Sequence, residues 1–162
     1  MKRGGLGMNV IKELLLHEKL IVTNLEAENA NNAIAKLAKV LFDNGYVKES
    51  YIKAVQDREK DFPTGLPTES VGVAIPHTEA VHVNTGAIAI GILKNTIKFR
   101  MMGMPEETVD VKIIFMMAIE KPHGQIMVLQ KIMKILQKNG LLEELEKCTQ
   151  PKGVIDFFSE LI

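Results

Sequence analysis

The chain has 162 residues, of which 46% are hydrophobic and 25% charged. This length and composition are typical of an ordinary globular domain and exclude a disordered chain. Twenty basic residues balance twenty acidic ones, so no overall field favours nucleic acid or an anionic membrane, and partners must be recognised by local patches.

The first residues do not resemble a signal peptide. Lys2 and Arg3 precede two glycines, and the next apolar run is interrupted by Lys12 and Glu13. Nowhere do about 18 uncharged apolar residues follow one another, so we expect no segment to insert into a membrane. A single cysteine, Cys148, cannot form an internal disulfide and fits a reducing compartment. We therefore expect a cytoplasmic protein.

Two helices are predicted early in the chain, over residues 28–42 and about 49–60. Asp43, Asn44 and Gly45 end the first, and Pro63 prevents continuation of the second. Arg58 extends the apolar face of the second helix, either as a surface arginine or as a guanidinium directed into a site. The apolar positions at helical spacing are Ala30, Ile34, Leu37, Ala38 and Leu41, then Tyr51, Ile52 and Val55.

Three core strands are predicted over residues 71–75, 87–93 and 109–117. The second places Ile88, Ile90 and Ile92 on one face and Ala87, Ala89 and Gly91 on the other. A strand that is apolar on both faces belongs inside a sheet covered by helices on each side. No linker or internal repeat divides the chain, so we expect one α/β domain over residues 1–162, with its core from about residue 8.

A further helix is predicted from Pro122 to near Gly140, because proline suits a first helical turn. A shorter helical stretch is expected to close the chain. The apolar face predicted for the helix after Pro122 consists of Ile126, Leu129, Ile132, Met133 and Leu136.

His77 is the first candidate for chemistry. The sequence has neither a GxxxxGK[ST] loop nor a GxGxxG after a strand, so nothing predicts a nucleotide phosphate site. His77 follows the strand 71–75 and Pro76, at a strand end where α/β proteins place ligands. A neutral imidazole has an unprotonated nitrogen and can act as a nucleophile. From position alone, His77 is either this nucleophile or a loop residue that follows the strand.

His123 is the second candidate, in the first turn of the helix after Pro122. Unpaired backbone N–H groups favour an anion there, so a neutral His123 could donate to a phosphate; otherwise it is an exposed first-turn residue. His17 and His82 have no such context. The four histidines lack chelating spacing and one cysteine cannot complete a common zinc set, so neither a metal nor a cofactor is expected.

Two neighbouring motifs surround His77: R-E-K-D-F-P-T-G-L-P at 58–67 and V-G-V-A-I-P-H-T-E at 71–79. They resemble the phosphohistidine signature of fructose/mannitol-type enzyme IIA domains of the sugar phosphotransferase system. Within that family the resemblance is closest to galactitol-type IIA proteins. Three further matches cover most of the chain: G-Y-V-K-E-S-Y at 45–51, I-K-F-R-M-M-G at 97–103 and P-H-G-Q-I-M-V-L-Q-K at 122–131.

The resemblance implies a mixed β-sheet with helices on both faces and a phosphocarrier function. Family members accept a phosphoryl group from the histidine phosphocarrier protein HPr. They pass it to a cysteine of an enzyme IIB partner, which serves the membrane transporter enzyme IIC. On this chain the resemblance makes His77 the acceptor and gives Arg58 and His123 supporting roles. Gly124 follows His123, where many relatives have leucine.

Two other functions remain as alternatives. A IIA-like domain can also be a regulatory module that docks to targets according to its phosphorylation state. A hydrolase or metal enzyme built on His77 and His123 has no supporting motif.

The apolar candidates for contacts with partner proteins are Leu66, Val81 and the segment 101–104. The alternative is that these are ordinary core residues. The transported sugar cannot be read from a phosphocarrier.

Overall fold

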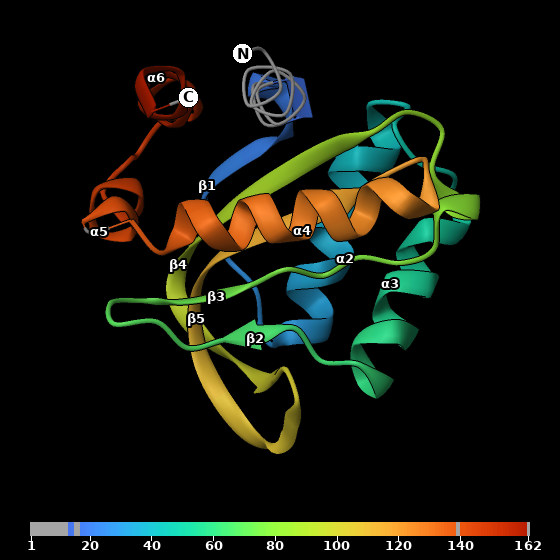
Figure 1. Ribbon diagram of the computed structural model, residues 1–162, viewed down its shortest axis with the longest axis horizontal. Coiled ribbons are helices and arrows are strands. Elements are labelled where there is room, and N and C mark those ends of the chain that lie inside the picture. The colour runs from blue at the N-terminus through green and yellow to red at the C-terminus, as the bar shows by residue number, and fades with distance from the viewer. Residues whose placement is uncertain (1–12, 15–16, 139, 162) are drawn as a thin grey trace.

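The predicted strands 87–93 and 109–117 are the inner halves of one long antiparallel hairpin. In the computed structural model, which describes residues 13–14, 17–138 and 140–161, β4 (Ala87–Met101) pairs with β5 (Met104–Ala118) from Ala87↔Ala118 to Met101↔Met104. The outer half of the hairpin extends beyond the helices (Figure 1). The sequence pattern did not indicate this half because its side chains are mostly exposed and lack an apolar face.

Five strands form a mixed sheet around this hairpin. β1 (Ile21–Leu25) runs parallel to β4, and β3 (Gly72–Ala74) runs parallel to β5. β2 (Gly65–Leu66) is antiparallel to β3 and also pairs once with β4 near the hairpin turn. β1 and β2 were not predicted, and β2 has only two residues, too few for any periodicity. The strand 71–75 is confirmed as β3.

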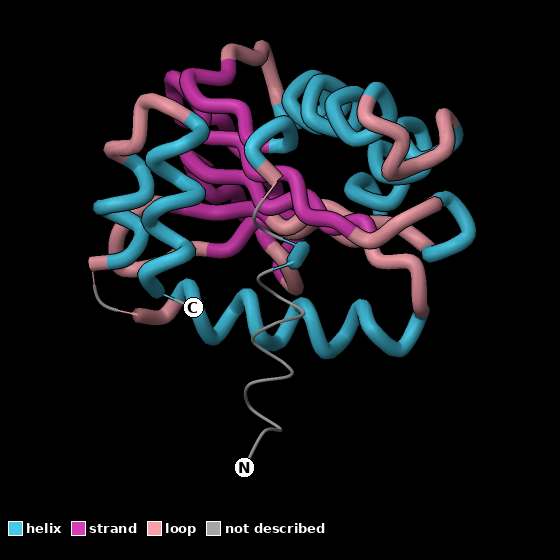
Figure 2. The backbone as a smooth tube through the Cα atoms, turned by 90° about the horizontal axis from the view of Figure 1, so that it is seen from above, coloured by secondary structure: helices cyan, strands magenta, loops and turns pink. Residues whose placement is uncertain are grey.

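Helices cover both faces of the sheet, as the two-sided apolar strand predicted (Figure 2). Ile88, Ile90 and Ile92 pack in one buried cluster with residues of the C-terminal helices. Ala87 and Ala89 lie in a second cluster with the two early helices. The expected α/β fold is therefore confirmed. The helices are α2 (Ala30–Asp43), α3 (Ser50–Asp61), α4 (Pro122–Leu136), α5 (Leu141–Glu146) and α6 (Pro151–Leu161), with short 3-10 turns η1 (Glu18–Leu20) and η2 (Ala80–His82).

One part of the predicted face of α4 is wrong. Ile126 is 65% exposed, and the buried residues of α4 begin at Val128 and include Ile135. The first turn of α4 is held to the loop after β3 by a hydrogen bond from Gln125 to Thr78, and Ile126 lies on the exposed side of this turn. Leu129 and Met133 pack at the margin of the core, while Ile132 and Leu136 are buried as predicted.

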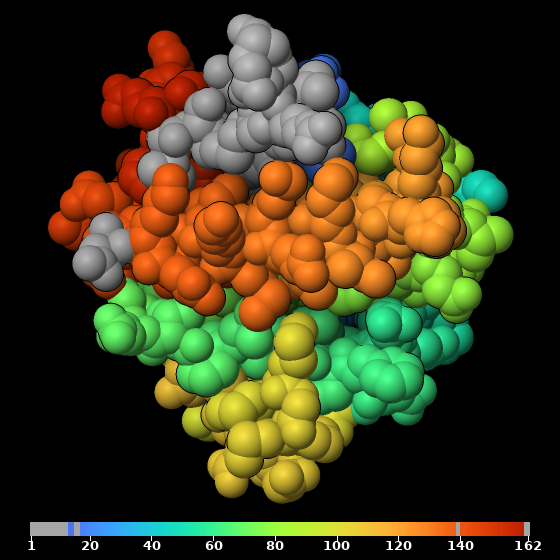
Figure 3. All heavy atoms as spheres, in the orientation of Figure 1, coloured from blue at the N-terminus to red at the C-terminus, as the bar shows by residue number. Residues whose placement is uncertain are grey.

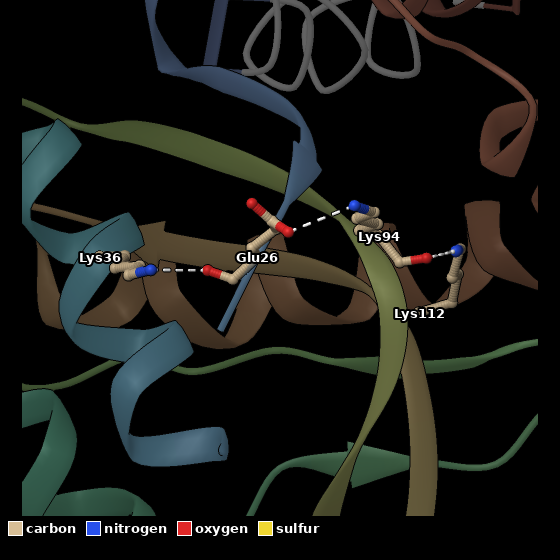
Figure 4. Close-up of polar contacts among 4 residues, drawn as sticks. All are labelled: Glu26, Lys36, Lys94 and Lys112. Atoms are coloured by element: carbon tan, nitrogen blue, oxygen red, sulfur yellow. Dashed lines mark hydrogen bonds and ion pairs between the residues drawn. The ribbon is translucent and has the colours of Figure 1, made fainter. Parts of the chain in front are cut away.

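Lysine side chains contact Glu26 in the segment that connects β1 to α2 (Figure 4). Lys36 Nζ donates to the backbone oxygen of Glu26 at 2.7 Å, and Lys94 Nζ lies 3.3 Å from the Glu26 carboxylate. Lys112 Nζ donates to the Lys94 carbonyl at 2.8 Å. The ion pair is exposed and stabilises the fold little, by about 0–1 kcal/mol. Across the described parts of the chain, no helix is long and apolar enough to cross a bilayer.

Candidate functional site

His77 lies where β3 leaves the sheet. The pairing with β5 continues as far as Pro76, whose carbonyl accepts a hydrogen bond from Met117 N at 3.0 Å. Proline itself has no N–H to continue the ladder, and the strand ends there. Tyr51 of α3 is buried and donates its hydroxyl to the Met117 carbonyl, so α3 is fixed to the same point. The half-buried ring of His77 therefore extends from a rigid position.

A hydrogen bond defines which ring nitrogen of His77 carries the proton. Nδ1 lies 2.9 Å from the Ile75 carbonyl oxygen. Because a carbonyl oxygen can only accept, Nδ1 donates and Nε2 of the neutral ring keeps a lone pair. Burial lowers the pKa of His77, the bond to Ile75 opposes this, and the positive charge of Arg58 lowers the pKa further. The neutral form with a nucleophilic Nε2 is therefore favoured at neutral pH.

Arg58 lies on the buried face of α3, one and two turns after Val55 and Tyr51. Its guanidinium carbon is 5.0 Å from the centre of the Phe62 ring, within the range of a cation–π contact. Arg58 Nε is buried and has no hydrogen-bond partner among the described residues. The structure thus brings a partly unsatisfied cation close enough to His77 to affect its pKa.

A partly buried carboxyl group next to Arg58 was not singled out from the sequence. Glu59 accepts hydrogen bonds from Thr64 N at 2.8 Å and from the Thr64 hydroxyl at 2.9 Å. The Thr64 hydroxyl in turn accepts from Ile75 N at 3.2 Å. Burial raises the pKa of Glu59 to about 7, opposed by the bonds from Thr64 and by Arg100. The motif R-E-K-D-F-P-T-G contains both partners, but their contact depends on the loop that joins α3 to β2.

The glycine of this motif is required by a close approach of two backbones. A Cβ atom on Gly65 would lie 2.6 Å from the carbonyl oxygen of Arg100. Such a distance is well inside van der Waals contact, so any side chain would push β2 away from β4. Gly65 therefore allows the loop that carries Thr64 to pack against the hairpin.

His123 is the second residue of α4 and is exposed. Its ring makes no hydrogen bond to the residues that the structure describes. Gln125, on the same turn, donates from Nε2 to the Thr78 carbonyl at 2.9 Å, which ties the start of α4 to the residue after His77. A Cβ on Gly124 would lie 3.1 Å from Ile119, a tight contact that the glycine avoids. The structure therefore connects the turn that carries His123 to the His77 loop without showing a direct contact between the rings.

The other two histidines have local structural contacts. His82 Nδ1 lies 2.8 Å from the Ser50 hydroxyl, and the His17 ring packs against Tyr46 with centroids 5.4 Å apart. Among the described residues, no group of three or more His, Cys, Asp or Glu side chains could hold a metal ion.

Exposed apolar side chains come from the segments that carry the candidate residues. Phe62 is 61% exposed beside Arg58, Val81 is 65% exposed in η2, and Ile126 is 65% exposed in α4 next to Gln125. Met104, at the hairpin turn, is also exposed. Two of the sequence candidates for partner contacts, Leu66 and Met101, are instead partly buried against the core.

A cavity of about 380 Å³ lies elsewhere, between the β2–β3 segment and the end of α4. These two segments are adjacent on the face seen in Figure 3. Its lining contains none of His77, Arg58 and His123. The geometry at His77 is that of a half-buried ring near a protein surface.

Comparison with known families finds a match over residues 14–161 to the family described as "Phosphoenolpyruvate-dependent sugar phosphotransferase system, EIIA 2". The galactitol-specific EIIA component of Escherichia coli K12 is 27% identical over 115 residues, which are 71% of this chain and 76% of that protein. The transcriptional regulator ManR of Bacillus subtilis is 30% identical over 142 residues, covering 88% of this chain but only 20% of the regulator.

Solved structures share the fold. The complex of enzyme IIAMTL and phosphorylated enzyme IIBMTL from Escherichia coli matches with a TM-score of 0.74 at 20% identity, over 91% of this chain and 99% of the matched chain. The nitrogen regulatory protein IIA-Ntr of Neisseria meningitidis matches with a TM-score of 0.71 at 21% identity, over 92% and 99%.

Proposed function

Because this chain belongs to the EIIA 2 family of the phosphoenolpyruvate-dependent sugar phosphotransferase system, we propose that it carries a phosphoryl group on His77. The group comes from phosphorylated HPr and passes to a cysteine of an enzyme IIB partner, which works with a membrane enzyme IIC. The galactitol-specific relative makes a sugar or polyol system the expected context.

The single observation that carries this proposal is the hydrogen bond from His77 Nδ1 to the Ile75 carbonyl. This bond leaves the lone pair on Nε2, and the lowered pKa of the ring favours its neutral form. Nε2 can therefore attack without a separate base that first removes a proton.

The transfer balances without any further reactant. Nε2 attacks the phosphorus as the N–P bond to the donor histidine of HPr breaks, and the bonding electrons return to that histidine. In the second step the cysteine thiolate of enzyme IIB attacks, the N–P bond to His77 breaks, and Nε2 recovers its lone pair. Such a reaction asks the protein mainly for in-line positioning and charge stabilisation.

Arg58 and His123 are proposed to stabilise the transferring group. By analogy with other phosphorylated side chains, the phosphoryl group adds nearly two negative charges, which favour a nearby guanidinium. The buried Nε of Arg58, which lacks a partner among the described residues, is a suitable donor. His123 lies at a helix N-terminus whose backbone N–H groups also favour an anion.

Labelling with phosphorylated HPr tests the proposal. We expect one acid-labile, base-stable phosphoryl group on the wild-type protein and none on His77→Ala, with intact-mass measurement as the readout. ATP in place of phosphorylated HPr should give no labelling. Undiminished labelling of His77→Ala would exclude His77 as the carrier.

A second candidate function is regulation by docking. The similarity to ManR, named as a transcriptional regulator, favours it, although the match covers only 20% of that protein. The two functions differ in their acceptor. A transport function predicts transfer of the phosphoryl group to an enzyme IIB encoded near the gene. Regulation is the better description if this transfer does not occur and the protein binds another target in only one phosphorylation state.

A further inference from the structure

We propose that Glu59 is a positioning residue for His77, which it orients through Thr64 and the backbone of Ile75. This inference rests on the proposed function of His77 and adds Glu59 to the residues that support it. Glu59 does not act on the phosphoryl group itself.

A chain of hydrogen bonds joins the two residues. His77 Nδ1 donates to the Ile75 carbonyl at 2.9 Å, and Ile75 N donates to the Thr64 hydroxyl at 3.2 Å. The Thr64 hydroxyl donates to Glu59 Oε1 at 2.9 Å, while Thr64 N donates to Glu59 Oε2 at 2.8 Å. Ile75 is therefore held from both sides: its N–H is fixed by Thr64, and its carbonyl fixes the imidazole.

The carboxylate determines the direction of these bonds. An ionised Glu59 can only accept, so the Thr64 hydroxyl must point its hydrogen at Glu59 and offer a lone pair to Ile75 N–H. With a pKa of about 7, Glu59 is ionised in a large share of molecules at neutral pH. A protonated Glu59 could donate to Thr64 and compete with Ile75 N–H for the same oxygen. The ionised form is thus the one that specifies the arrangement around Ile75.

The surroundings of Glu59 support a role beyond filling space. Its side chain borders a cavity of about 160 Å³ together with the basic residues Lys60, Lys98 and Arg100. The positive charge of Arg100 from β4 favours the ionised form of Glu59. Burying a carboxyl group costs stability compared with an apolar side chain of similar volume. Two hydrogen bonds from Thr64 hold this partly buried carboxylate to the loop beside the strand that ends at His77.

Two isosteric variants test the proposal. Glu59→Gln keeps the shape but has only one acceptor oxygen, and Thr64→Val removes the hydroxyl that links Glu59 to Ile75. We expect each to slow phosphorylation by phosphorylated HPr by about 10-fold to 100-fold, because sub-ångström misplacement of a reacting group has effects of this order. The double variant should be no slower than the worse single variant, since both act along one path. Thr64→Ser, which keeps the hydroxyl, should recover most of the rate lost in Thr64→Val.

The ring of His77 gives a readout that a purely stabilising role would not change. Nitrogen-15 NMR of the wild-type imidazole should show the Nδ1–H tautomer, and the fraction of this tautomer should fall in Glu59→Gln and Thr64→Val. Glu69→Gln, in the exposed β2–β3 loop, is the matched control and should match wild type in rate and spectrum. Thermal melts identify any variant that fails to fold. If either Glu59→Gln or Thr64→Val does not fold, the rate and tautomer of the other variant decide whether the proposal holds.

The outcomes separate the two proposals. Folded variants with the wild-type rate and the wild-type tautomer would overturn the role of Glu59 while leaving the phosphocarrier function intact. A wild-type protein that cannot be phosphorylated would overturn the function, and the NMR comparison would still test the positioning. Additive rate losses in the double variant would show that Glu59 and Thr64 act independently, contrary to the proposal.

Discussion

At the scale of single residues, one charge acts on His77 in two opposite ways. The guanidinium of Arg58 disfavours the protonated imidazole and so lowers its pKa. In the proposed phosphorylated form, the same positive charge would stabilise the attached anion. Under this proposal, Arg58 favours both the neutral acceptor before transfer and the charged product after it.

Removal of either supporting group should slow transfer while the fold stays intact. Loss of a charge-assisted hydrogen bond in a transition state costs about 2 to 4 kcal/mol, a rate effect on the order of 10² to 10³. We expect losses up to this size for Arg58→Ala and smaller losses for His123→Ala, because His123 is exposed to solvent. Stopped-flow transfer from phosphorylated HPr and onward to enzyme IIB measures both steps. Wild-type rates in both variants would leave His77 working without these groups.

The pKa of His77 should rise in Arg58→Ala. The change removes a positive charge and admits water, and both effects favour the protonated ring. A titration of the His77 ring by NMR measures the pKa in each protein. A pKa that stays unchanged or falls would contradict the assigned influence of Arg58.

The same shift predicts how stability depends on pH. Folded His77 has a pKa below its unfolded value of about 6.5, so between these two values the unfolded chain binds more protons. This contribution to the free energy of unfolding is fully present above the unfolded pKa and is lost as the pH falls through that window. Its slope is at most about 1.4 kcal/mol per pH unit for one proton. Glu59, whose pKa is raised to about 7, contributes a slope of opposite sign over part of the same range. The test is therefore the difference in the free energy of unfolding between wild type and Arg58→Ala, measured with denaturant from pH 5 to pH 8, and wild type should gain on the variant as the pH rises.

At the scale of elements, the site depends on how the start of α4 is attached to the loop after β3. Gln125→Ala removes the bond to the Thr78 carbonyl, which should let the first turn of α4 move relative to His77. We expect a loss of about 0.5–1.5 kcal/mol in stability. Transfer should slow by about tenfold, because His123 is displaced. Gln130→Ala, an exposed position on the same helix, is the matched control and should change neither quantity.

Two glycine substitutions should have opposite effects on stability. Gly65→Ala would place Cβ 2.6 Å from the Arg100 carbonyl and should destabilise the protein by about 1–3 kcal/mol or more. Gly153→Ala lies in α6, where the nearest atom to the new Cβ is Cys148 Sγ at 3.8 Å, and alanine favours a helix by up to about 1 kcal/mol. Urea unfolding compares the two. A neutral Gly65→Ala would mean that β2 can shift without cost.

The sequence predicted the elements that have a regular apolar pattern and missed those that depend on tertiary contacts. The helices α2 and α3, the start of α4 and the strand β3 were predicted within a few residues, because their buried faces repeat at a fixed period. β1, β2 and the outer hairpin were missed because they are short or exposed. The partly buried link between Glu59 and Thr64 was also missed, since each residue alone is typical of a protein surface and only the fold brings them together.

At the scale of the whole molecule, the segments around the site meet at one end of the sheet. α3, the loop that follows it, the loop after β3 and the start of α4 are joined there by contacts of Tyr51, Thr64 and Gln125. The lysine cluster of Figure 4 lies beside the middle of β4, near Leu25 and Leu93. If His77 carries the phosphoryl group as proposed, a partner that receives it must approach the end of the sheet at His77, where Phe62, Val81 and Ile126 are exposed.

These exposed apolar residues should contribute to docking of both partners. Ile126→Ser and Val81→Ser remove apolar area from side chains that are each 65% exposed, so neither should weaken folding by more than about 0.5 kcal/mol. For phosphorylated HPr, we expect each to raise KM severalfold with little change in kcat, because an apolar contact at an interface stabilises the ground state and the transition state alike. Met104→Ser, at the hairpin turn, distinguishes between the two exposed regions. If KM rises only in Met104→Ser, the docking surface includes the hairpin and not the start of α4, and the surface assigned around His77 is wrong.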